Sequence, residues 1–314
     1  AGDCRDTVVA GSRDHDDAGY EHHAGCDFGG ESPLIRTDFI MQTKSISRFL
    51  LIAGLAGSTL PADTTLKGPV LGYVLDGRSQ AIRPVNGIPG AAHVGTPLAL
   101  PFAVARAAFS SNGDFALVVA AEAEDLLLVR NLEAPVVSRL AGAIRPERMV
   151  LNGDNSAALL YTSEPRRLQV VRGLPNNPVA GPRLDLSSLT GTVTALALDR
   201  DGREALLALS DNGRGTLARV AVPDEGEANE LRSVEPRSLG VFGSLTAVAL
   251  LNRDRDAVVT DGATNQLFLI RDFTGEAAIE ALASERDGIA NPVGVEASLD
   301  GRRVFVANGA EPGG

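Results

Sequence analysis

Hydrophobic residues after position 63 fall in short runs, and polar turns containing Asn, Asp or Gly separate these runs. Runs of this length joined by such turns predict β-hairpins, whereas apolar positions at the helical spacing of about 3.6 residues are hard to find. A turn followed by an apolar strand recurs five times, at 110–120 (SSNGDFALVVA), 151–162 (LNGDNSAALLYT), 199–210 (DRDGREALLALS), 252–262 (NRDRDAVVTDG) and 298–309 (SLDGRRVFVANG). The pattern predicts an all-β chain built from internal repeats.

A second marker, an Arg near the end of a short strand, recurs with a similar period along the chain. Five short strands carry an Arg near their end, at intervals of 47, 42, 47 and 52 residues: Arg83, Arg130, Arg172, Arg219 and Arg271. Another β-type run precedes each turn, and a weaker one follows each Arg strand, as at 135–142 and 277–284. Four short strands in each period predict the four-stranded antiparallel blade of a β-propeller, with the Arg at the end of the third strand.

The repeated Arg has two interpretations. Guanidinium groups suit carboxylates and phosphates, so five of them could form a ring around an anion. Third strands lie well out from the axis of a propeller, however, and this would spread the five side chains around the disc. We therefore expect each Arg to end its strand at the solvent.

The chain resembles the YVTN-type β-propeller repeat proteins, in which a strand, a DG turn and a V-x-V-A-N strand recur. The segment 298–310 (SLDGRRVFVANGA) carries this core, and 69–95 is similar to the opening of secreted bacterial propellers of unknown function. The resemblance covers about residues 67–314 and specifies the fold much better than any activity. It implies a secreted or periplasmic seven-bladed disc.

The repeats amount to about five blades. We count a half blade at 69–88 (third and fourth strands), four whole blades at 103–290 and a half blade at 293–309 (first and second strands). Either the two half blades pair and close a five-bladed ring, or the sequence is truncated from a seven-bladed disc. The length usual in the family favours truncation.

Residues 1–40 are a different kind of sequence. They hold both cysteines and three of the four histidines, namely Cys4, Cys26, His15, His22 and His23. Their spacing matches no standard zinc framework, and Asp- and Gly-rich aperiodic sequence is typical of disorder. We interpret 1–40 as a non-native extension upstream of the true start.

Residues 41–62 have the layout of a secretory signal peptide. Met41 opens a basic segment with Lys44 and Arg48, an apolar run follows from Phe49 to Gly57, and small residues continue to Ala62. Nine apolar residues are too few to span a bilayer. We therefore expect an extracytoplasmic mature protein, the propeller at 63–314, with no membrane span.

Charge and composition argue against several classes of ligand and cofactor. A net charge of −11 with 4% aromatic residues disfavours nucleic acid, whose binding needs a basic surface. The chain after residue 62 has no Cys and one His, so we predict no zinc, no iron and no cofactor. The acids at 199–202 (DRDG) and 252–256 (NRDRD) could ligate calcium, but they lack a later bidentate Glu, and hairpin turns use the same residues.

Other candidate motifs are weak. The segment 210–217 (SDNGRGTL) departs from the sialidase Asp box in register and lacks its closing aromatic residue, so we interpret it as a loop. The glycines at 87–95 lack the dinucleotide-binding spacing, and His93 among them is expected to be an exposed loop residue. The sequence contains no nucleophile elbow, no CxxC pair and no HExxH motif.

Two functional classes remain. The first is a non-catalytic propeller that binds a protein or small ligand on one face of the disc. The second is a lactonase-like hydrolase or lyase, with acids, amides and a divalent metal in the central channel. The predicted first strands are almost wholly apolar, with Glu147, Arg148 and Glu296 as the main polar exceptions, and this favours binding. We assign no catalytic or metal-ligating residue, and the binding residues and the ligand or partner are unknown.

Overall fold

A computed structural model describes residues 9–11, 68–224, 226–251, 253–298 and 301–309. The residues fall into two units, 1–12 with 68–314, and 13–67. The second unit lies outside the described residues, as do the proposed signal peptide and the early cysteines and histidines. Among residues 1–40, only β1 (Val9–Gly11) is described, and it pairs antiparallel with β23.

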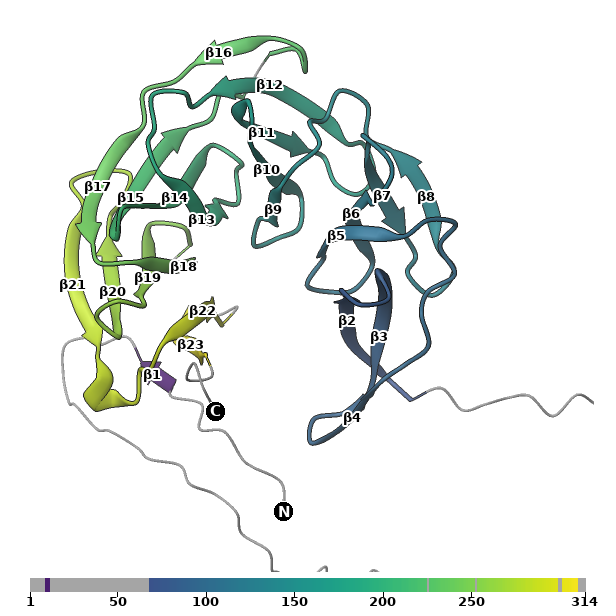
Figure 1. Ribbon diagram of the computed structural model, residues 1–314, viewed down its shortest axis with the longest axis horizontal. Coiled ribbons are helices and arrows are strands. Elements are labelled where there is room, and N and C mark those ends of the chain that lie inside the picture. The colour runs from purple at the N-terminus through teal and green to yellow at the C-terminus, as the bar shows by residue number, and fades with distance from the viewer. Residues whose placement is uncertain (1–8, 12–67, 225, 252, 299–300, 310–314) are drawn as a thin grey trace, which may run out of the picture. The chain divides into compact units, whose positions relative to one another are not determined.

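The described residues form six β-sheets, which we number as blades 1 to 6 in chain order (Figure 1). Blade 1 contains β2 (Val70–Asp76), β3 (Ala81–Ile88) and β4 (Ala91–Val94). Blade 2 contains β5 (Val104–Phe109), β6 (Phe115–Ala120), β7 (Leu126–Arg130) and β8 (Val136–Arg139). Blade 3 contains β9 (Arg148–Leu151), β10 (Ala157–Ser163), β11 (Arg166–Arg172) and β12 (Val179–Asp185), with β16 (Leu231–Ser233) added in parallel at its outer edge.

The next two blades are also four-stranded. Blade 4 contains β13 (Thr192–Leu198), β14 (Glu204–Asp211), β15 (Arg214–Ala221) and β17 (Arg237–Phe242). Blade 5 contains β18 (Leu245–Leu251), β19 (Asp256–Asp261), β20 (Gln266–Arg271) and β21 (Ala278–Ala283). Blade 6 contains β22 (Pro292–Ala297), β23 (Arg303–Asn308) and β1. The 3₁₀ turn at Glu285–Asp287 is the one helix in the described part of the chain.

The arrangement is that of a β-propeller, as predicted. The first described strand of each blade contacts that of the next, in the order β2, β5, β9, β13, β18 and β22. Figure 1 shows the blades following one another with these strands on the inside. The predicted all-β fold with four-stranded antiparallel blades is therefore confirmed.

The hydrophobic core lies between blades, with one cluster at each of the five contacts between neighbours. β6 shows why, because all six of its residues are buried. Phe115, Leu117 and Val119 pack toward blade 3, whereas Ala116 and Val118 pack toward blade 1. Side chains alternate across a strand, so a second strand that is apolar at every position holds two neighbours at once.

The turns that mark the repeat share one hydrogen-bond pattern. In four blades the residue directly after the first strand donates its N–H to the carbonyl five residues later, and its side chain accepts the N–H of that same later residue. The four residues are Ser110, Asn152, Asp199 and Ser298. Ser, Asn and Asp suit this place because their short side chains can bond nearby backbone. The recurring polar residue in the sequence is thus a turn-closing group.

Four of the described inner strands share a second feature, a β-bulge at their second or third residue. The register shifts there when β5, β13, β18 and β22 pair with their second strands. In β13 and β18 the extra residue is Thr194 or Thr246. The hydroxyl of Thr194 donates to the carbonyl of Leu245 at 2.8 Å, and that of Thr246 donates to the carbonyl of Pro292 at 2.7 Å. These two bulges thereby link their blades to the next.

Three of the five repeated arginines occupy the predicted place. Arg130, Arg172 and Arg271 are the last residues of the third strands β7, β11 and β20. Arg219 lies two residues before the end of β15, and Arg83 is the third residue of β3. The prediction was wrong for these two because β15 continues for two residues beyond Arg219, and because Arg83 comes only two residues after the start of β3.

The first blade also corrects the sequence count. β2 and β3 are the second and third strands of blade 1, and β4 is the fourth, whereas 69–88 was predicted to hold the third and fourth. The hairpin after β2 matches the hairpin after β19. Asp76 accepts the N–H groups of the residues two and three positions later, as Asp261 does, and the left-handed residue is Gln80 in one and Asn265 in the other.

Ring closure by strand pairing does not occur among the described residues. β2 pairs with β3 alone, and β22 pairs with β23 alone. The first alternative, in which the outermost half blades join into one sheet, is therefore not what the described strands form.

Candidate functional site

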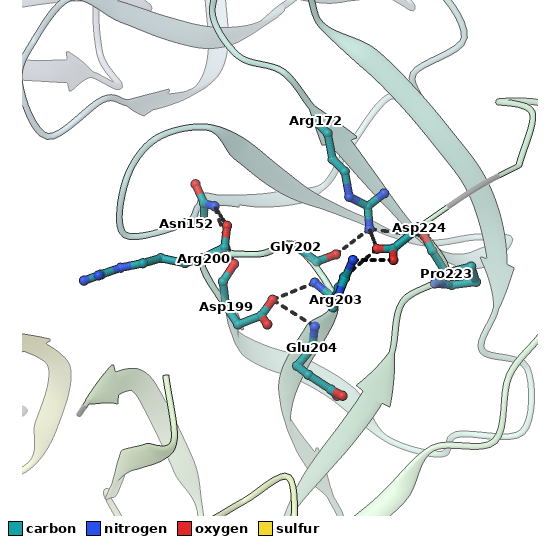
Figure 2. Close-up of polar contacts among 9 residues, drawn as sticks. All are labelled: Asn152, Arg172, Asp199, Arg200, Gly202, Arg203, Glu204, Pro223 and Asp224. Carbon is teal, nitrogen blue, oxygen red and sulfur yellow. Dashed lines mark hydrogen bonds and ion pairs between the residues drawn. The ribbon is translucent and has the colours of Figure 1, made fainter. Parts of the chain in front are cut away.

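One of the repeated arginines, Arg172, bonds protein groups and not an open anion site. The Arg172 Nη2 donates to the carbonyl of Gly202 at 2.5 Å and to that of Pro223 at 3.1 Å, and it lies 3.9 Å from the Asp224 carboxylate. Figure 2 shows these contacts at the junction of blades 3 and 4. Gly202 has φ +69, and a Cβ there would lie 3.1 Å from the Arg172 Nε. Arg172 therefore bonds the turn of the neighbouring blade.

The predicted calcium segments are turns that join blades. Asp199 Oδ1 accepts the N–H of Arg203 at 2.7 Å and that of Glu204 at 2.9 Å (Figure 2). Burial raises the pKa of Asp199. The Asp254 carboxylate of the second segment accepts the N–H of Arg200 at 2.8 Å. Within the described ranges, no three His, Cys, Asp or Glu side chains lie close enough together to hold a metal ion.

The polar residues predicted on first strands do not converge. Glu147 precedes β9 in blade 3, and Glu296 lies on β22 in blade 6. Burial acts to raise the pKa of Glu147, but hydrogen bonds from Ser163 and Thr162 more than offset this effect and lower it. Partial desolvation by the surrounding protein raises the pKa of the Glu296 carboxyl, although the residue is exposed at the surface.

Arg148, on β9, and His93, on β4, are both exposed. His93 is a strand residue and not part of a loop, since β4 runs from Ala91 to Val94. It belongs to blade 1, so it is also separate from Glu147 and Glu296. The structure thus brings together none of the candidates for channel chemistry.

A pocket that the sequence did not predict lies on blade 4, at the hairpin between β14 and β15. We call it the hairpin pocket. Its volume is about 340 Å³, and its lining consists of Ser188, Leu189, Thr190, Leu209, Asp211, Arg214, Thr216 and Val241. It opens at the rim of the core between blades 3 and 4, because Leu209 belongs to that core.

Strand register builds the floor of the hairpin pocket. Leu209 pairs with Thr216, and Thr216 pairs with Val241, so the three side chains form a row across three strands. Asp211 and Arg214 are also partners, two residues further along their strands. Since residues i and i+2 share one face of a sheet, all five side chains point to the same side.

The segment interpreted as a loop supplies three of these five residues, namely Asp211, Arg214 and Thr216. Residues 210–217 form the end of β14, a two-residue turn and the start of β15. Asn212 and Gly213 both have positive φ, at 50° and 78°, as a type I′ hairpin requires. The departure from the Asp box was correctly noted, but the interpretation as a loop was wrong.

The wall of the hairpin pocket is the connection from blade 3 to blade 4. The guanidinium of Arg166, on β11, donates to the carbonyl of Leu189 and, at 2.8 Å, to that of Gly191. Gly191 has φ +80, and a Cβ there would lie 2.6 Å from the carbonyl oxygen of Ser210. The wall is thus held in place by one Arg and by a close approach that requires Gly.

The lining combines groups of opposite charge with hydroxyls. Arg214 and Asp211 are both exposed, and Thr216 is half-buried. The Asp211 Oδ1 accepts a hydrogen bond from its neighbour Asn212 at 2.9 Å. A guanidinium suits carboxylate or phosphate, and Asp, Ser and Thr oxygens suit hydroxyl groups. The arrangement can bind a small molecule that carries an anionic group and hydroxyls over an apolar floor.

Comparisons with known proteins agree with the fold. No model of a known protein family matches the sequence, and no curated protein matches it. A functionally unknown protein from Desulfotomaculum acetoxidans DSM 771 has a similar structure, with a TM-score of 0.55, 15% identity and coverage of 75% of this chain and 72% of that chain. The Kuenenia stuttgartiensis hydrazine synthase has a TM-score of 0.50 at 14% identity, covering 81% and 77%.

A periplasmic gluconolactonase from Pseudomonas aeruginosa has a TM-score of 0.45 at 19% identity, covering 72% of this chain and 66% of that chain. That score is too low to support a functional comparison. At identities this low, the likeness to all three structures concerns the fold alone. No helix in the described part of the chain is long and apolar enough to cross a membrane.

Proposed function

We propose that the protein is a non-catalytic, extracytoplasmic β-propeller that binds a small polar ligand in the hairpin pocket. The observation that carries the proposal is the composition of the lining. The charged side chains of Arg214 and Asp211 lie next to the apolar side chains of Leu209 and Val241. Concave sites with an apolar floor and a few fixed polar groups are the usual form of small-molecule sites.

The chemistry of the lining defines the ligand class. Arg214 provides a charged fork for a carboxylate or phosphate, and Ser188, Thr190 and Thr216 provide hydroxyls. A small hydroxylated acid meets both requirements. The volume of about 340 Å³ is at the lower end of the range usual for ligand pockets.

The alternative of a lactonase-like hydrolase or lyase lacks a specific supporting observation. It would place several acids and amides together at the inner ends of the first strands. Glu147 and Glu296 belong to blades 3 and 6, and Glu147 is engaged by Ser163 at 2.7 Å. Binding is therefore the function that we propose.

We also infer that the repeats are of the YVTN type. Support comes from the residue that ends the second strand, which is Asn308 in the VFVAN segment. Its Oδ1 accepts the N–H of Ala290 at 3.1 Å, and its Nδ2 donates to the carbonyl of Gly288 at 2.8 Å. Asp261, at the same place in blade 5, accepts the N–H groups of Gly243 and Ser244. A polar residue there fixes the entry into its blade.

Calorimetric titration with two probes tests the ligand class. Gluconate and sorbitol have closely related polyhydroxylated skeletons, but only gluconate carries a carboxylate. We expect gluconate to bind and sorbitol not to bind at the same millimolar concentration, because Arg214 recognises the anionic group. Arg214→Gln should weaken gluconate binding by roughly ten- to a hundred-fold, since a hydrogen bond to a charged group contributes about 1.5–3 kcal/mol.

Arg78→Gln is the matched control, because Arg78 is an exposed Arg on a hairpin of blade 1. It removes the same charge from a place outside the hairpin pocket. Equal affinity of wild type and Arg214→Gln for gluconate, or equal weakening by both variants, would contradict the proposed site.

A further inference from the structure

Five Asn-Gly steps occur in the sequence, and each has the composition that forms a cyclic imide. They begin at Asn86, Asn112, Asn152, Asn212 and Asn308. The backbone nitrogen after an Asn can attack the side-chain amide carbon, and glycine hinders this attack least because it has no Cβ. The fold decides which steps react, because the attacking nitrogen must be free of hydrogen bonds and the amide must be free to turn toward it.

Three of the steps are protected at the attacking nitrogen. In each of them the glycine N–H donates to a backbone carbonyl at 2.8–3.0 Å: Gly87 to Pro69, Gly113 to Ser110 and Gly309 to Asn291. The nitrogen must break this bond before it can reach the amide carbon, so the local structure has to open first. We therefore expect these three steps to react slowly in the folded chain.

The step at Asn152 is protected at the amide instead. Asn152 is 3% exposed. Its Oδ1 accepts the N–H of Ala157 at 2.9 Å, and its Nδ2 donates to the carbonyl of Arg200 at 2.8 Å. The side chain cannot turn toward the nitrogen that follows it without breaking both bonds and leaving buried polar groups unpaired.

The step at Asn212 has neither protection. Asn212 and Gly213 are both exposed and form the turn between β14 and β15. Strand pairing ends at Asp211 and Arg214, which leaves the Gly213 N–H outside the ladder and bonded to no described residue. A Cβ on Gly213 would meet nothing within 4 Å, so this glycine borders open space. The Asn212 amide makes one hydrogen bond within the described residues, from its Nδ2 to Asp211 at 2.9 Å.

We propose that Asn212 is a site of spontaneous deamidation in the folded protein and reacts faster than the other four Asn-Gly steps. The Gly213 nitrogen forms a bond to the Asn212 Cγ, the bond from Cγ to Nδ2 breaks, and ammonia leaves with the proton of the Gly213 N–H. Water then adds to one of the two imide carbonyls and opens the ring to Asp or isoaspartate. The net reaction is hydrolysis of an amide, so it needs no oxidant, reductant or cofactor.

The product changes the turn beside the hairpin pocket. The Nδ2 group that donates to Asp211 is replaced by a carboxylate, which places two like charges on adjacent residues. Isoaspartate also adds one carbon to the main chain of a turn that has two residues, and loop length sets the register of a hairpin. The modification therefore alters the turn that places Asp211 beside Arg214. The inference itself does not rest on the proposed function.

Peptide mapping of the full chain in heavy-oxygen water tests the proposal. The folded protein is incubated at mildly alkaline pH in this water, then digested in ordinary water and analysed by mass spectrometry. Deamidation during the incubation introduces heavy oxygen, whereas deamidation during digestion does not. We expect label at Asn212 to accumulate at least roughly ten-fold faster than at any other Asn-Gly step, since ten-fold corresponds to about 1.4 kcal/mol of local opening.

The same incubation in guanidinium chloride is the control for the fold. Unfolding removes every protection, so the five steps should then react at similar rates. Asn212→Gln should abolish the label at this turn, because the six-membered ring that Gln would form closes much more slowly, and Asn112→Gln should leave the label at Asn212 unchanged.

Two results would overturn the proposal. In the first, Asn112 or Asn308 gains label as fast as Asn212 in the folded chain, or Asn212 gains none while the unfolded chain reacts. In the second, the preference for Asn212 is equally strong in guanidinium chloride, because local sequence and not the fold would then be its cause. Mapping gives these results whether or not the hairpin pocket binds gluconate.

Discussion

At the scale of single residues, short polar side chains close the turns by accepting hydrogen bonds from the backbone. Ser110, Asn152 and Asp199 close equivalent turns by accepting the same backbone N–H group, although they are three different residue types. The carboxylate of Asp261 accepts several backbone N–H groups at once. It is 1% exposed and accepts the N–H groups of Gly243, Ser244 and Ala263 at 2.7, 2.8 and 3.0 Å. One side chain thus fixes the connection from blade 4 into blade 5.

Asp261→Asn tests this role through the pH dependence of stability. Burial alone would raise the pKa of Asp261, but the backbone donors, Ser244 and Gly243 first among them, hold it below its ordinary value. A lowered pKa means stability that is present above the unfolded value, near 3.9, and is lost as pH falls through the folded value. The variant should lose about 1–3 kcal/mol in the free energy of unfolding at pH 7.

Denaturant titrations at pH 7 and at successively lower pH measure this effect. The difference between wild type and Asp261→Asn should shrink as the pH falls below about 4, because the wild type then loses the ionised group. Asp201→Asn, an exposed turn Asp, is the control and should change little at any pH. A difference that stays constant with pH would count against the ionised carboxylate as the stabilising group.

At the scale of strands and hairpins, the guanidinium of Arg172 connects two blades. It donates to the carbonyls of Gly202 and Pro223, both in blade 4, from the end of a strand in blade 3. Arg130 ends the equivalent strand of blade 2, and it makes no such bond to another described residue. The two arginines therefore share a position in the repeat but not a set of contacts.

Arg172→Met and Arg130→Met form a matched pair. Both keep an apolar stem and remove one charge at the same place in the repeat. Arg172→Met should lower the free energy of unfolding by about 1–3 kcal/mol, since two carbonyls lose a charged donor, and Arg130→Met should change it by less than about 0.5 kcal/mol. Chemical denaturation measures both values. Equal losses would show that the contact with Gly202 contributes nothing specific.

Periodicity predicted the strands well because each one is a local pattern. The alternation that buries both faces of β6 is visible in FALVVA, and the turn before it is visible in SSNGD. Register was harder. Arg83 and Arg219 were aligned by residue type, but Arg219 lies two residues before the end of β15, and Arg83 lies only two residues after the start of β3. The order of strands in blade 1 was misjudged for the same reason.

The hairpin pocket could not be predicted from the sequence, although its hairpin could. Its wall depends on Arg166 reaching the carbonyl of Gly191, a contact between segments of two blades. The row from Leu209 to Val241 depends on a pairing between β15 and β17 that crosses a long connection. The one local signal was the NG turn at 212–213, which predicts a hairpin and therefore places Asp211 beside Arg214.

At the scale of the whole molecule, each described blade packs only against its neighbours in the chain. Five clusters of buried side chains lie at five successive contacts, and none is shared by three blades. Stability in such an array is approximately a sum of blade terms and nearest-neighbour terms. A substitution in one cluster should therefore affect two blades directly and the others little.

One prediction at this scale concerns residues 1–62, which precede the propeller in the sequence. We propose that residues 1–62 are absent from the exported protein, because a signal-like segment begins at Met41. N-terminal sequencing of protein recovered outside the cytoplasm should find a start near Asp63. Recovery of Ala1 as the first residue would refute both the upstream extension and the signal peptide.

The bulge in the inner strands bears on how sharply the chain curves. A bulge adds one residue to one strand only, which bends that strand and increases its local twist. In β13 and β18 the hydroxyl of the added Thr also donates a hydrogen bond to a carbonyl at the start of the next inner strand. Among the described residues the same insertion recurs in the inner strands of blades 2, 4, 5 and 6. Deleting Thr194 would therefore remove both the bulge of β13 and the hydrogen bond that ties blade 4 to the start of β18.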